Sequence, residues 1–264
     1  MKTAFQLSLF CCLFLLTACQ DDDDMRPALE VPDTYAFVRD GQTTVSFSGQ
    51  TARIGMATEL IGAMKDPSVT EEALDNMFTN PDGVDPFNDS ELNASTKSVR
   101  SKVAASQDLY SGNATGAATI KADFDAWIAA QVDEVFPRWN DLAAPGEAGQ
   151  IADDGSTRYV NGWGLEYNQA VNKALIGALM YDQLANNYLG TAVLDEGTNR
   201  NDNDAGTVAD GKNYTTMEHK WDEAFGYLFG AVANPASPLT DLGSADAFLN
   251  KYLGRVEGDT DYAG

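Results

Sequence analysis

His219 is the only histidine in the chain, and it stands beside acidic residues at helical spacing. Asp222 follows it by three positions and Glu223 by four. Residues three and four apart lie on one face of a helix, so this imidazole and these carboxylates could together bind iron or another divalent metal. A single helical turn does not supply enough ligands, so a complete metal site needs a second helix.

Glu166 and Asp182, on the longest expected helix, are the candidate ligands from a second helix. Metal sites in helical bundles are built in this way, from side chains on facing helices. The alternative is that the acidic residues form a solvated flank and that His219 makes only a surface ion pair. The two interpretations differ in geometry, because a metal site requires His219 and Glu166 to face each other in the core.

Other catalytic and ion-binding motifs are absent from the sequence. It contains no Gly-x-Ser-x-Gly, no His-Glu-x-x-His and no phosphate-binding glycine loop. The Asn- and Asp-rich run 199–206 lacks the glycine and the bidentate glutamate that a calcium loop requires at fixed positions. Aromatic residues stand at helical spacing within the expected helices, Trp127 and Trp221 among them, which favours core packing over a ligand platform.

The first residues have the three parts of an export signal. Met1-Lys-Thr3 is the charged start, residues 4–16 form an apolar stretch, and Leu16-Thr-Ala-Cys19 follows it. The stretch is too short to span a bilayer, which takes roughly 20 residues. Since Leu-Thr-Ala-Cys resembles a lipobox, we expect a lipoprotein signal peptide over residues 1–18 and acyl chains on Cys19. Ordinary secretion without lipid is the alternative.

Residues 19–32 are expected to form an acidic tether between the lipid and the folded part of the chain. The carboxylates of Asp21 to Asp24 repel one another and stay solvated. Acidic residues just behind the anchor resemble an export signal of some Gram-negative lineages, which predicts an outer-membrane lipoprotein exposed at the cell surface. The alternative is a flexible spacer with no such role.

Charge and cysteine content exclude several classes of protein. The formal net charge of −23 repels nucleic acid, and it favours cations, metals or a basic partner. Cys11 and Cys12 leave with the signal and Cys19 is acylated, so the mature chain keeps no thiol. A disulfide framework, a cysteine nucleophile and thiolate metal sites are thereby excluded.

The hydrophobic pattern predicts an all-α helical bundle with a small N-terminal β-hairpin. Two alternating runs, 35–39 and 43–47, flank Asp40-Gly41 and indicate the hairpin. Apolar residues three and four apart predict the helices. We expect helices over 51–65, 68–78, 95–106, 117–136, 161–188, 214–229 and 245–256, loops over 80–93 and 195–213, and an exposed linker over 143–157.

The expected helices have recognisable ends. Ser68, with Glu71 three residues later, predicts a capping box, and Asn161 is expected to cap the longest helix. The helical domain is assigned to residues 33–264. Because the chain stops soon after its last expected helix, we expect this domain to be truncated at its C-terminus.

Several runs of the sequence resemble a lipoprotein family known only as domain of unknown function 4856. The likeness spans most of the mature chain, and the family name implies no activity. The runs are Pro32-Asp-Thr-Tyr-Ala-Phe37, Ser48-Gly-Gln50, Gly164-Leu-Glu-Tyr-Asn168, Gly177-Ala-Leu-Met-Tyr-Asp-Gln183, Met217-Glu-His-Lys-Trp-Asp-Glu223 and Gly226-Tyr-Leu-Phe-Gly230.

The segment around His219 is also distantly similar to imelysin-type proteins, which are helical-bundle envelope proteins linked to iron uptake and once classed as peptidases. Their signature is His-x-x-Glu after a glycine. Here Asp222 takes the place of the glutamate and Glu218 that of the glycine. These departures leave a peptidase role unsupported, and the longer double bundle of that family agrees with a truncated chain.

Three functions remain open at this point. The first is a membrane-tethered binding protein for iron, haem or another metal, with a core cluster of His219 and Glu166 or Asp182. The second is a peptidase-like hydrolase, which needs a metal with an open coordination position. The third is a structural or partner-binding surface module, with an exposed apolar groove and an outward-facing His219.

Overall fold

The structure is a computed structural model that describes residues 32–258. The elements below all lie in the unit that starts at Thr34. This unit is mainly helical, which confirms the predicted fold class. The described helices are α1 (Ser48–Ala63), α2 (Glu71–Thr79), α3 (Ser90–Asn93), α4 (Gln107–Tyr110), α5 (Ala114–Ala130), α6 (Tyr167–Leu175), α7 (Thr191–Leu194), α8 (Asn199–Asp204), α9 (Thr216–Phe229) and α10 (Leu249–Glu257).

Two of the long helices continue in other helical forms. Helix α5 runs into a π-helical segment, η1 (Gln131–Val135), and a 3-10 turn, η2 (Phe136–Arg138), where Pro137 ends it. Helix α6 continues through two π-helical segments, η3 (Ile176–Tyr181) and η4 (Leu184–Tyr188). A further 3-10 turn, η5 (Pro238–Asp241), precedes α10.

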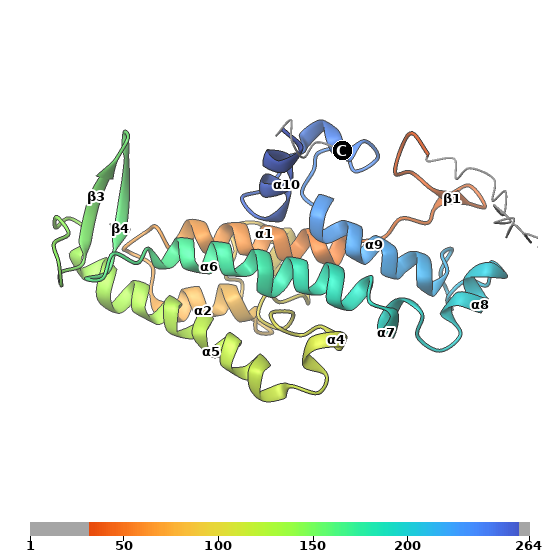
Figure 1. The fold of residues 1–264 in the computed structure, drawn as a ribbon, viewed down its shortest axis with the longest axis horizontal. Coiled ribbons are helices and arrows are strands. Elements are labelled where there is room, and N and C mark those ends of the chain that lie inside the picture. The colour runs from red at the N-terminus through yellow and green to blue at the C-terminus, as the bar shows by residue number, and fades with distance from the viewer. Residues whose placement is uncertain (1–31, 259–264) are drawn as a thin grey trace, which may run out of the picture. The chain divides into compact units, whose positions relative to one another are not determined.

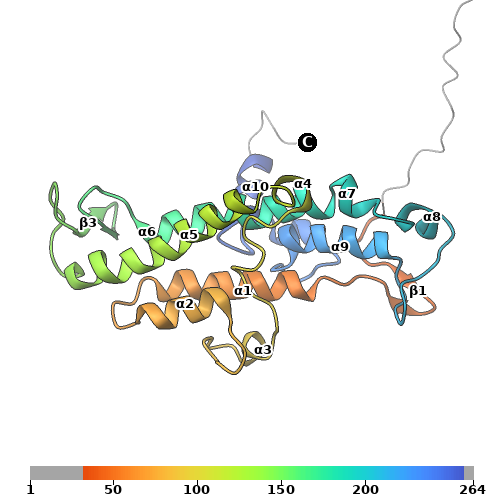
Figure 2. The same cartoon turned by 90° about the horizontal axis from the view of Figure 1, so that it is seen from below.

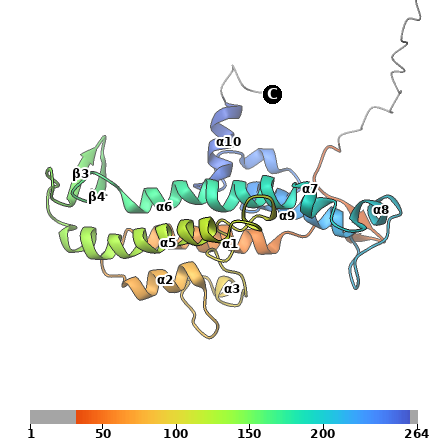
Figure 3. The same ribbon diagram turned by 60° about the horizontal axis from the view of Figure 1, so that its bottom comes forward.

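Helices α1, α6 and α9 run alongside one another (Figure 1), and α1 contacts both of the others. Helices α2 and α5 pack on the other side of α1 and α6, as the turned view in Figure 2 shows. Helix α10 projects from one side of this layer at a steep angle and contacts α9 and η3 (Figure 3). The arrangement brings segments from both ends of the described chain against α9.

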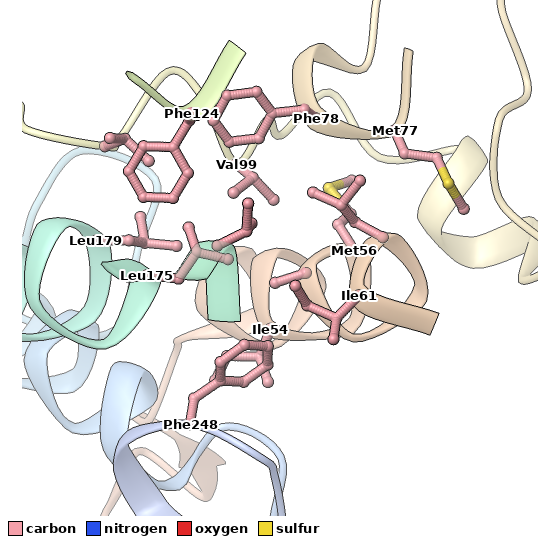
Figure 4. Packing of buried hydrophobic residues seen from close by; sticks show 14 of the residues in the cluster. Ile54, Met56, Ile61, Met77, Phe78, Val99, Phe124, Leu175, Leu179 and Phe248 are labelled. Carbon is pink, nitrogen blue, oxygen red and sulfur yellow. The ribbon is translucent and has the colours of Figure 1, made fainter. Parts of the chain in front are cut away.

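The apolar side of α1 forms the centre of the core. Its predicted apolar positions, Ile54, Ala57, Leu60, Ile61 and Met64, are all at most 6% exposed. Burying each large apolar side chain stabilises the fold by about 1.5–3 kcal/mol. Figure 4 shows aromatic rings closing this core from two sides, with Phe78 beside Phe124 and with Phe248 reaching Ile54 from the opposite side.

The predicted N-terminal hairpin is present, although its strands are shorter than expected. β1 (Val38–Arg39) pairs antiparallel with β2 (Gln42–Thr43). The two turn residues, Asp40 and Gly41, have φ values of 53° and 76°. Positive φ at both positions is the two-residue turn whose twist fits a hairpin, and Asp-Gly is a preferred sequence for it.

A second hairpin corrects the linker expected over 143–157. β3 (Gly149–Asp153) pairs antiparallel with β4 (Ser156–Val160). Tyr159 on β4 stacks on Trp139, with ring centroids 3.4 Å apart. The sequence does not reveal these strands, because their residues are mostly exposed and do not alternate between polar and apolar.

The helix expected over 95–106 was wrong. Backbone amides of this stretch donate to other elements and not along a helix. The Arg100 amide donates to the Phe78 carbonyl, and the Ala104 amide donates to the Ala178 carbonyl. Ala104 also has a φ of 45°, which a right-handed helix does not allow. The short helices α3 and α8 lie within the stretches that were expected to be loops.

Two helix starts also differ from expectation. α2 is capped by Thr70, whose hydroxyl accepts from the Ala73 amide, and not by Ser68. The long helix begins at Tyr167, because the Asn161 side chain binds the amides of Trp163 and Leu165 in a turn ahead of it. Among the described residues, no helix is both long and apolar enough to cross a membrane.

Candidate functional site

Helix α9 carries most of the predicted site residues, and a capping box fixes its first turn. The Thr215 hydroxyl accepts from the Glu218 amide at 3.1 Å, while the Glu218 carboxylate accepts from the Thr215 amide at 2.7 Å. These two bonds satisfy backbone donors that the helix itself leaves free. Residues 218 and 222 thereby share one face, and residues 219 and 223 share a neighbouring face.

A cleft of about 700 Å³ lies along the face of α9 that carries residue 222. Its walls come from α9, from the N-terminal hairpin segment and from the region of α7 and α8. Clefts of this size, with mostly apolar walls and a few polar groups, are typical of small-molecule sites. The lining residues are Tyr35, Ala36, Phe37, Val38, Arg39, Thr44, Leu194, Asn203, Met217, Glu218, Trp221 and Asp222.

Asp222 is the central polar group of the cleft, and it is only 4% exposed. Its Oδ1 accepts from the Tyr35 hydroxyl at 2.6 Å, and its Oδ2 accepts from the Ser46 amide at 2.8 Å. Both donors are neutral. Among residues 32–258, no Lys, Arg or His nitrogen lies within 4.0 Å of this carboxylate.

Burial raises the pKa of Asp222 to about 6, because a carboxylate removed from water disfavours its charged form. The Tyr35 and Ser46 hydrogen bonds act in the opposite direction, and the neighbouring Glu218 and Glu223 carboxylates add to the rise. The group therefore changes charge close to neutral pH. Perturbed carboxyl groups of this kind are concentrated at functional sites.

Arg39 and Glu218 form the second polar feature of the cleft. The two guanidinium nitrogens of Arg39 bind the two oxygens of Glu218 at 2.8 Å each, and Arg39 also donates to the Asn213 carbonyl. Hydrogen bonds from Arg39 hold the pKa of Glu218 below its ordinary value. This pair neutralises itself, so Asp222 remains the one unpaired charge among the residues that line the cleft.

Aromatic side chains form the apolar part of the cleft. The ring of Tyr35 stacks on Phe225 with centroids 3.6 Å apart and meets Phe37 edge-on at 5.1 Å. Trp221 is 53% exposed and Phe37 39%, so both offer ring surface to an incoming molecule. The prediction that Trp221 packs in the core is therefore wrong, whereas Trp127 does pack against the core.

His219 lies on the neighbouring face of α9 and does not enter this cleft. Its ring stacks on Tyr214 with centroids 4.7 Å apart, and its Nε2 lies 3.9 Å from the Glu223 carboxylate. Burial lowers the pKa of His219, while Glu223 opposes this shift. His219 and Glu223 are thus brought together, as the helical spacing predicts, and Asp222 points elsewhere.

Glu166 and Asp182 do not complete a site with His219. Glu166 precedes α6 and pairs with Arg158 at 3.4 Å. Asp182 is buried and accepts from the amides of Ala105 and Ser106. Of the expected metal ligands, the structure brings His219 and Glu223 together, whereas Asp222 and Glu166 are bound to other partners.

No group of three or more His, Cys, Asp and Glu side chains is arranged to hold a metal ion within residues 32–258. The lipid-anchor residue Cys19, the signal peptide 1–18 and most of the tether lie outside the described residues. The predictions made for them therefore stay predictions.

Sequence reasoning did not find the N-terminal half of the cleft. Tyr35 and Arg39 reach α9 from more than 170 positions away, and neither residue carries a motif. Two weak signals for this half of the cleft were present in the sequence. They are the aromatic residues around Tyr35 and the Asp40-Gly41 turn, at which the chain reverses direction.

Comparison with known proteins adds one finding. The matching family model is described as "Domain of unknown function (DUF4856)", and it covers residues 32–264. Neither the curated proteins nor the solved structures contain a match. The predicted family is confirmed, and the imelysin likeness stays a prediction.

Proposed function

The chain belongs to the DUF4856 family, and we propose that it is an envelope-anchored binding protein whose cleft takes a small organic cation with an apolar body. One observation carries the proposal: Asp222 is a buried carboxylate at the wall of an aromatic cleft, and no cationic side chain of the described residues pairs with it. A buried charge is costly unless a partner compensates it. A cationic ligand is such a partner.

The rest of the cleft supports the same ligand class. Trp221 and Phe37 present exposed ring surface, and aromatic faces attract cations in addition to apolar groups. The net charge of −23 attracts cations to the protein at long range. The self-neutralised Arg39–Glu218 pair adds no opposing charge.

The location of the protein is proposed from its sequence. Acyl chains on Cys19 would hold the domain at the outer membrane, with residues 19–32 as the tether, and exposure at the cell surface follows from the acidic run behind the anchor. Mass spectrometry of the N-terminal peptide tests this point. Acylated Cys19 supports the anchor, and an unmodified thiol or an intact signal peptide contradicts it.

Residues 32–258 offer less support for the metal-binding and peptidase alternatives. His219 and Glu223 supply two ligands at most, while Asp222 is bound to Tyr35 and Ser46. Two side chains do not make the three-ligand site of a metal-dependent hydrolase. The binding function is the one that the arrangement of side chains supports best.

A pair of matched probes tests the proposed ligand class. Benzyltrimethylammonium and benzenesulfonate both carry a phenyl ring and differ in the sign of their charge. Each probe is titrated into the full-length protein at neutral pH in a calorimeter. The cation should show saturable binding, and the sulfonate should show none.

Variants of two tryptophans provide the control. Trp221→Ala should weaken binding of the cation by about ten-fold, since a cation–aromatic contact contributes about 0.5–2 kcal/mol and the ring also buries apolar surface. Trp163→Ala removes a tryptophan that is 92% exposed and does not line the cleft, so binding should be unchanged. Equal binding of both probes, or of neither, contradicts the proposal.

A further inference from the structure

A second cavity, of about 330 Å³, lies against the face of α9 that carries His219 and Glu223. Its other walls are the start of α1, the loop that carries Lys97 and Lys102, and the rings of Tyr188 and Tyr214. In contrast to the aromatic cleft, this cavity is mainly polar. The residues that line it are Ser46, Phe47, Ser48, Gly49, Gln50, Arg53, Lys97, Lys102, Tyr188, Tyr214, His219 and Glu223.

Arg53 is a buried cation at the wall of this cavity. The residue is only 7% exposed, and its guanidinium donates to two neutral backbone carbonyls, those of Ser98 at 3.1 Å and Gly49 at 3.2 Å. Within the described part of the chain, no carboxylate oxygen lies within 4.0 Å of it. A buried guanidinium normally has an anionic partner, because removing its charge from water is costly.

Two lysines add to the positive charge. Lys97 crosses the first turn of α1, close enough that a Cβ placed on Gly49 would lie 3.0 Å from its Cε. Lys102 is half-buried, and its pKa is lowered first by burial and then by the nearby charge of Arg53. Neither lysine has a carboxylate within 4.0 Å among residues 32–258.

The one acidic residue that lines the cavity is already paired. Glu223 binds the Lys220 ammonium at 2.9 Å and accepts from Gln50 at 3.4 Å. The charge of Glu223 is thus compensated by Lys220, and Arg53, Lys97 and Lys102 remain in excess. A local excess of three cations is notable in a protein whose net charge is −23, because chance placement would surround basic groups with carboxylates.

Two neutral groups at the same cavity can also donate hydrogen bonds. Helix α1 starts at Ser48 with no side-chain cap, and the Gln50 amide donates to the Phe47 carbonyl, so the amides of Ser48 and Gly49 are the ones available to an anion, as at other helix N-termini. The ring of His219 also lines the cavity, and its buried Nδ1 can donate to an anion in the tautomer that carries the proton there. An oxyanion in the cavity could therefore accept hydrogen bonds from these neutral groups in addition to those from the three cations.

We propose that this cavity binds a phosphate or sulfate group, carried by a free ion or by a small organic ester. Multivalent oxyanions fit because guanidinium, ammonium and backbone N–H groups bind several oxygens of one anion at once. The site is separate from the cleft of the proposed function, since it lies on the neighbouring face of α9 and shares no lining residue with that cleft. The failure of either assignment leaves the other standing.

Calorimetric titration of the full-length protein with inorganic phosphate, inorganic sulfate and glycerol phosphate tests the proposal, with chloride keeping the ionic strength constant. We expect saturable binding of at least one of these anions and a higher Tm in its presence, because a ligand that binds only the folded state stabilises it. Binding of the inorganic ions assigns the site to a free anion, and binding of glycerol phosphate alone assigns it to an ester.

Lysine variants identify the cavity as the site. Lys97→Gln and Lys102→Gln should each weaken anion binding by about ten-fold, since each removes one charge-assisted hydrogen bond to the anion. Lys65→Gln makes the same change of charge beyond the far end of α1 and should leave affinity unchanged. Absence of saturable binding of all three anions, or equal affinity in all three variants, overturns the proposal. Lys97 is exposed and Lys102 is half-buried over the Tyr188 ring, so the Tm of each variant without anion is measured beside its affinity to confirm that it folds.

Discussion

The hydroxyl of Tyr35 donates a 2.6 Å hydrogen bond to Asp222, which lies 187 positions later in the chain. This bond joins the N-terminal hairpin segment to α9 and forms the polar centre of the aromatic cleft. Burial has the largest effect on the pKa of Asp222 and raises it, and the Tyr35 hydrogen bond opposes this rise, because a donor to the ionised form favours that form.

Tyr35→Phe should raise the pKa of Asp222 above about 6, since the Tyr35 hydrogen bond lowers that pKa in the intact protein. Loss of a hydrogen bond to a charged group should also lower the free energy of unfolding by about 1–3 kcal/mol. NMR titration of the Asp222 carboxyl and urea unfolding measure the two effects. An unchanged or lower pKa would show that the hydroxyl does not support the charged carboxylate.

Ligand binding in the cleft should depend on pH through Asp222. With a pKa of about 6, the carboxylate is mostly ionised at pH 7 and mostly protonated at pH 5, so affinity for benzyltrimethylammonium should fall about ten-fold between these values. The nearby Glu218 keeps its charge in this range, because Arg39 holds its pKa low. Calorimetric titration at both pH values checks the expectation, and Asp222→Asn should abolish the dependence.

Stability should show the opposite dependence on pH. The pKa of Asp222 is raised on folding, so the folded state binds more protons between about pH 4 and 6, and this group destabilises the fold as pH rises through that range. Lowering the pH from 7 to 5 should recover roughly 1 kcal/mol of stability from this residue after allowance for solvent screening. Urea unfolding of the intact protein and of Asp222→Asn isolates the effect. A difference between them that does not change with pH would contradict it.

The close packing of α9 on α1 should depend on Gly226. A Cβ at this position would lie 2.6 Å from the Cβ of Phe47 and 2.9 Å from that of Gln50, which is closer than real contacts allow. Gly226→Ala should therefore destabilise the protein by about 1–3 kcal/mol. Gly62→Ala, on the exposed side of α1 with nothing within 4 Å, should instead be stabilising by up to about 1 kcal/mol. Thermal unfolding compares the two, and a similar Tm for both would contradict the close approach.

Metal binding should not depend on His219. Of the residues expected to bind a metal with it, His219 lies close only to Glu223. His219→Ala should therefore leave the affinity for Fe²⁺ and Zn²⁺ unchanged. Elemental analysis of the purified protein and metal titration of both forms measure this. Stoichiometric binding that is lost in the variant would restore the bundle-core metal site.

The local parts of this molecule were predictable, and the parts formed by distant contacts were not. The Asp40-Gly41 turn and the apolar face of α1 follow from a few neighbouring residues, and both are present. The second hairpin lacks a regular pattern, and the stretch 95–106 is held by contacts with α2 and η3. For the site, helical spacing places Glu223 beside His219, whereas the partners of Asp222 come from the N-terminal segment, which local spacing does not reveal.

On the proposed assignments, α9 separates two sites of opposite preference, a cation cleft at Asp222 and an anion cavity beside Glu223. Titration of benzyltrimethylammonium and of phosphate into three proteins, the intact chain, Trp221→Ala and Lys102→Gln, tests this claim. We predict that Trp221→Ala weakens only the cation and that Lys102→Gln weakens only phosphate. Loss of both ligands in either variant, or binding of neither ligand by the intact chain, would contradict the claim.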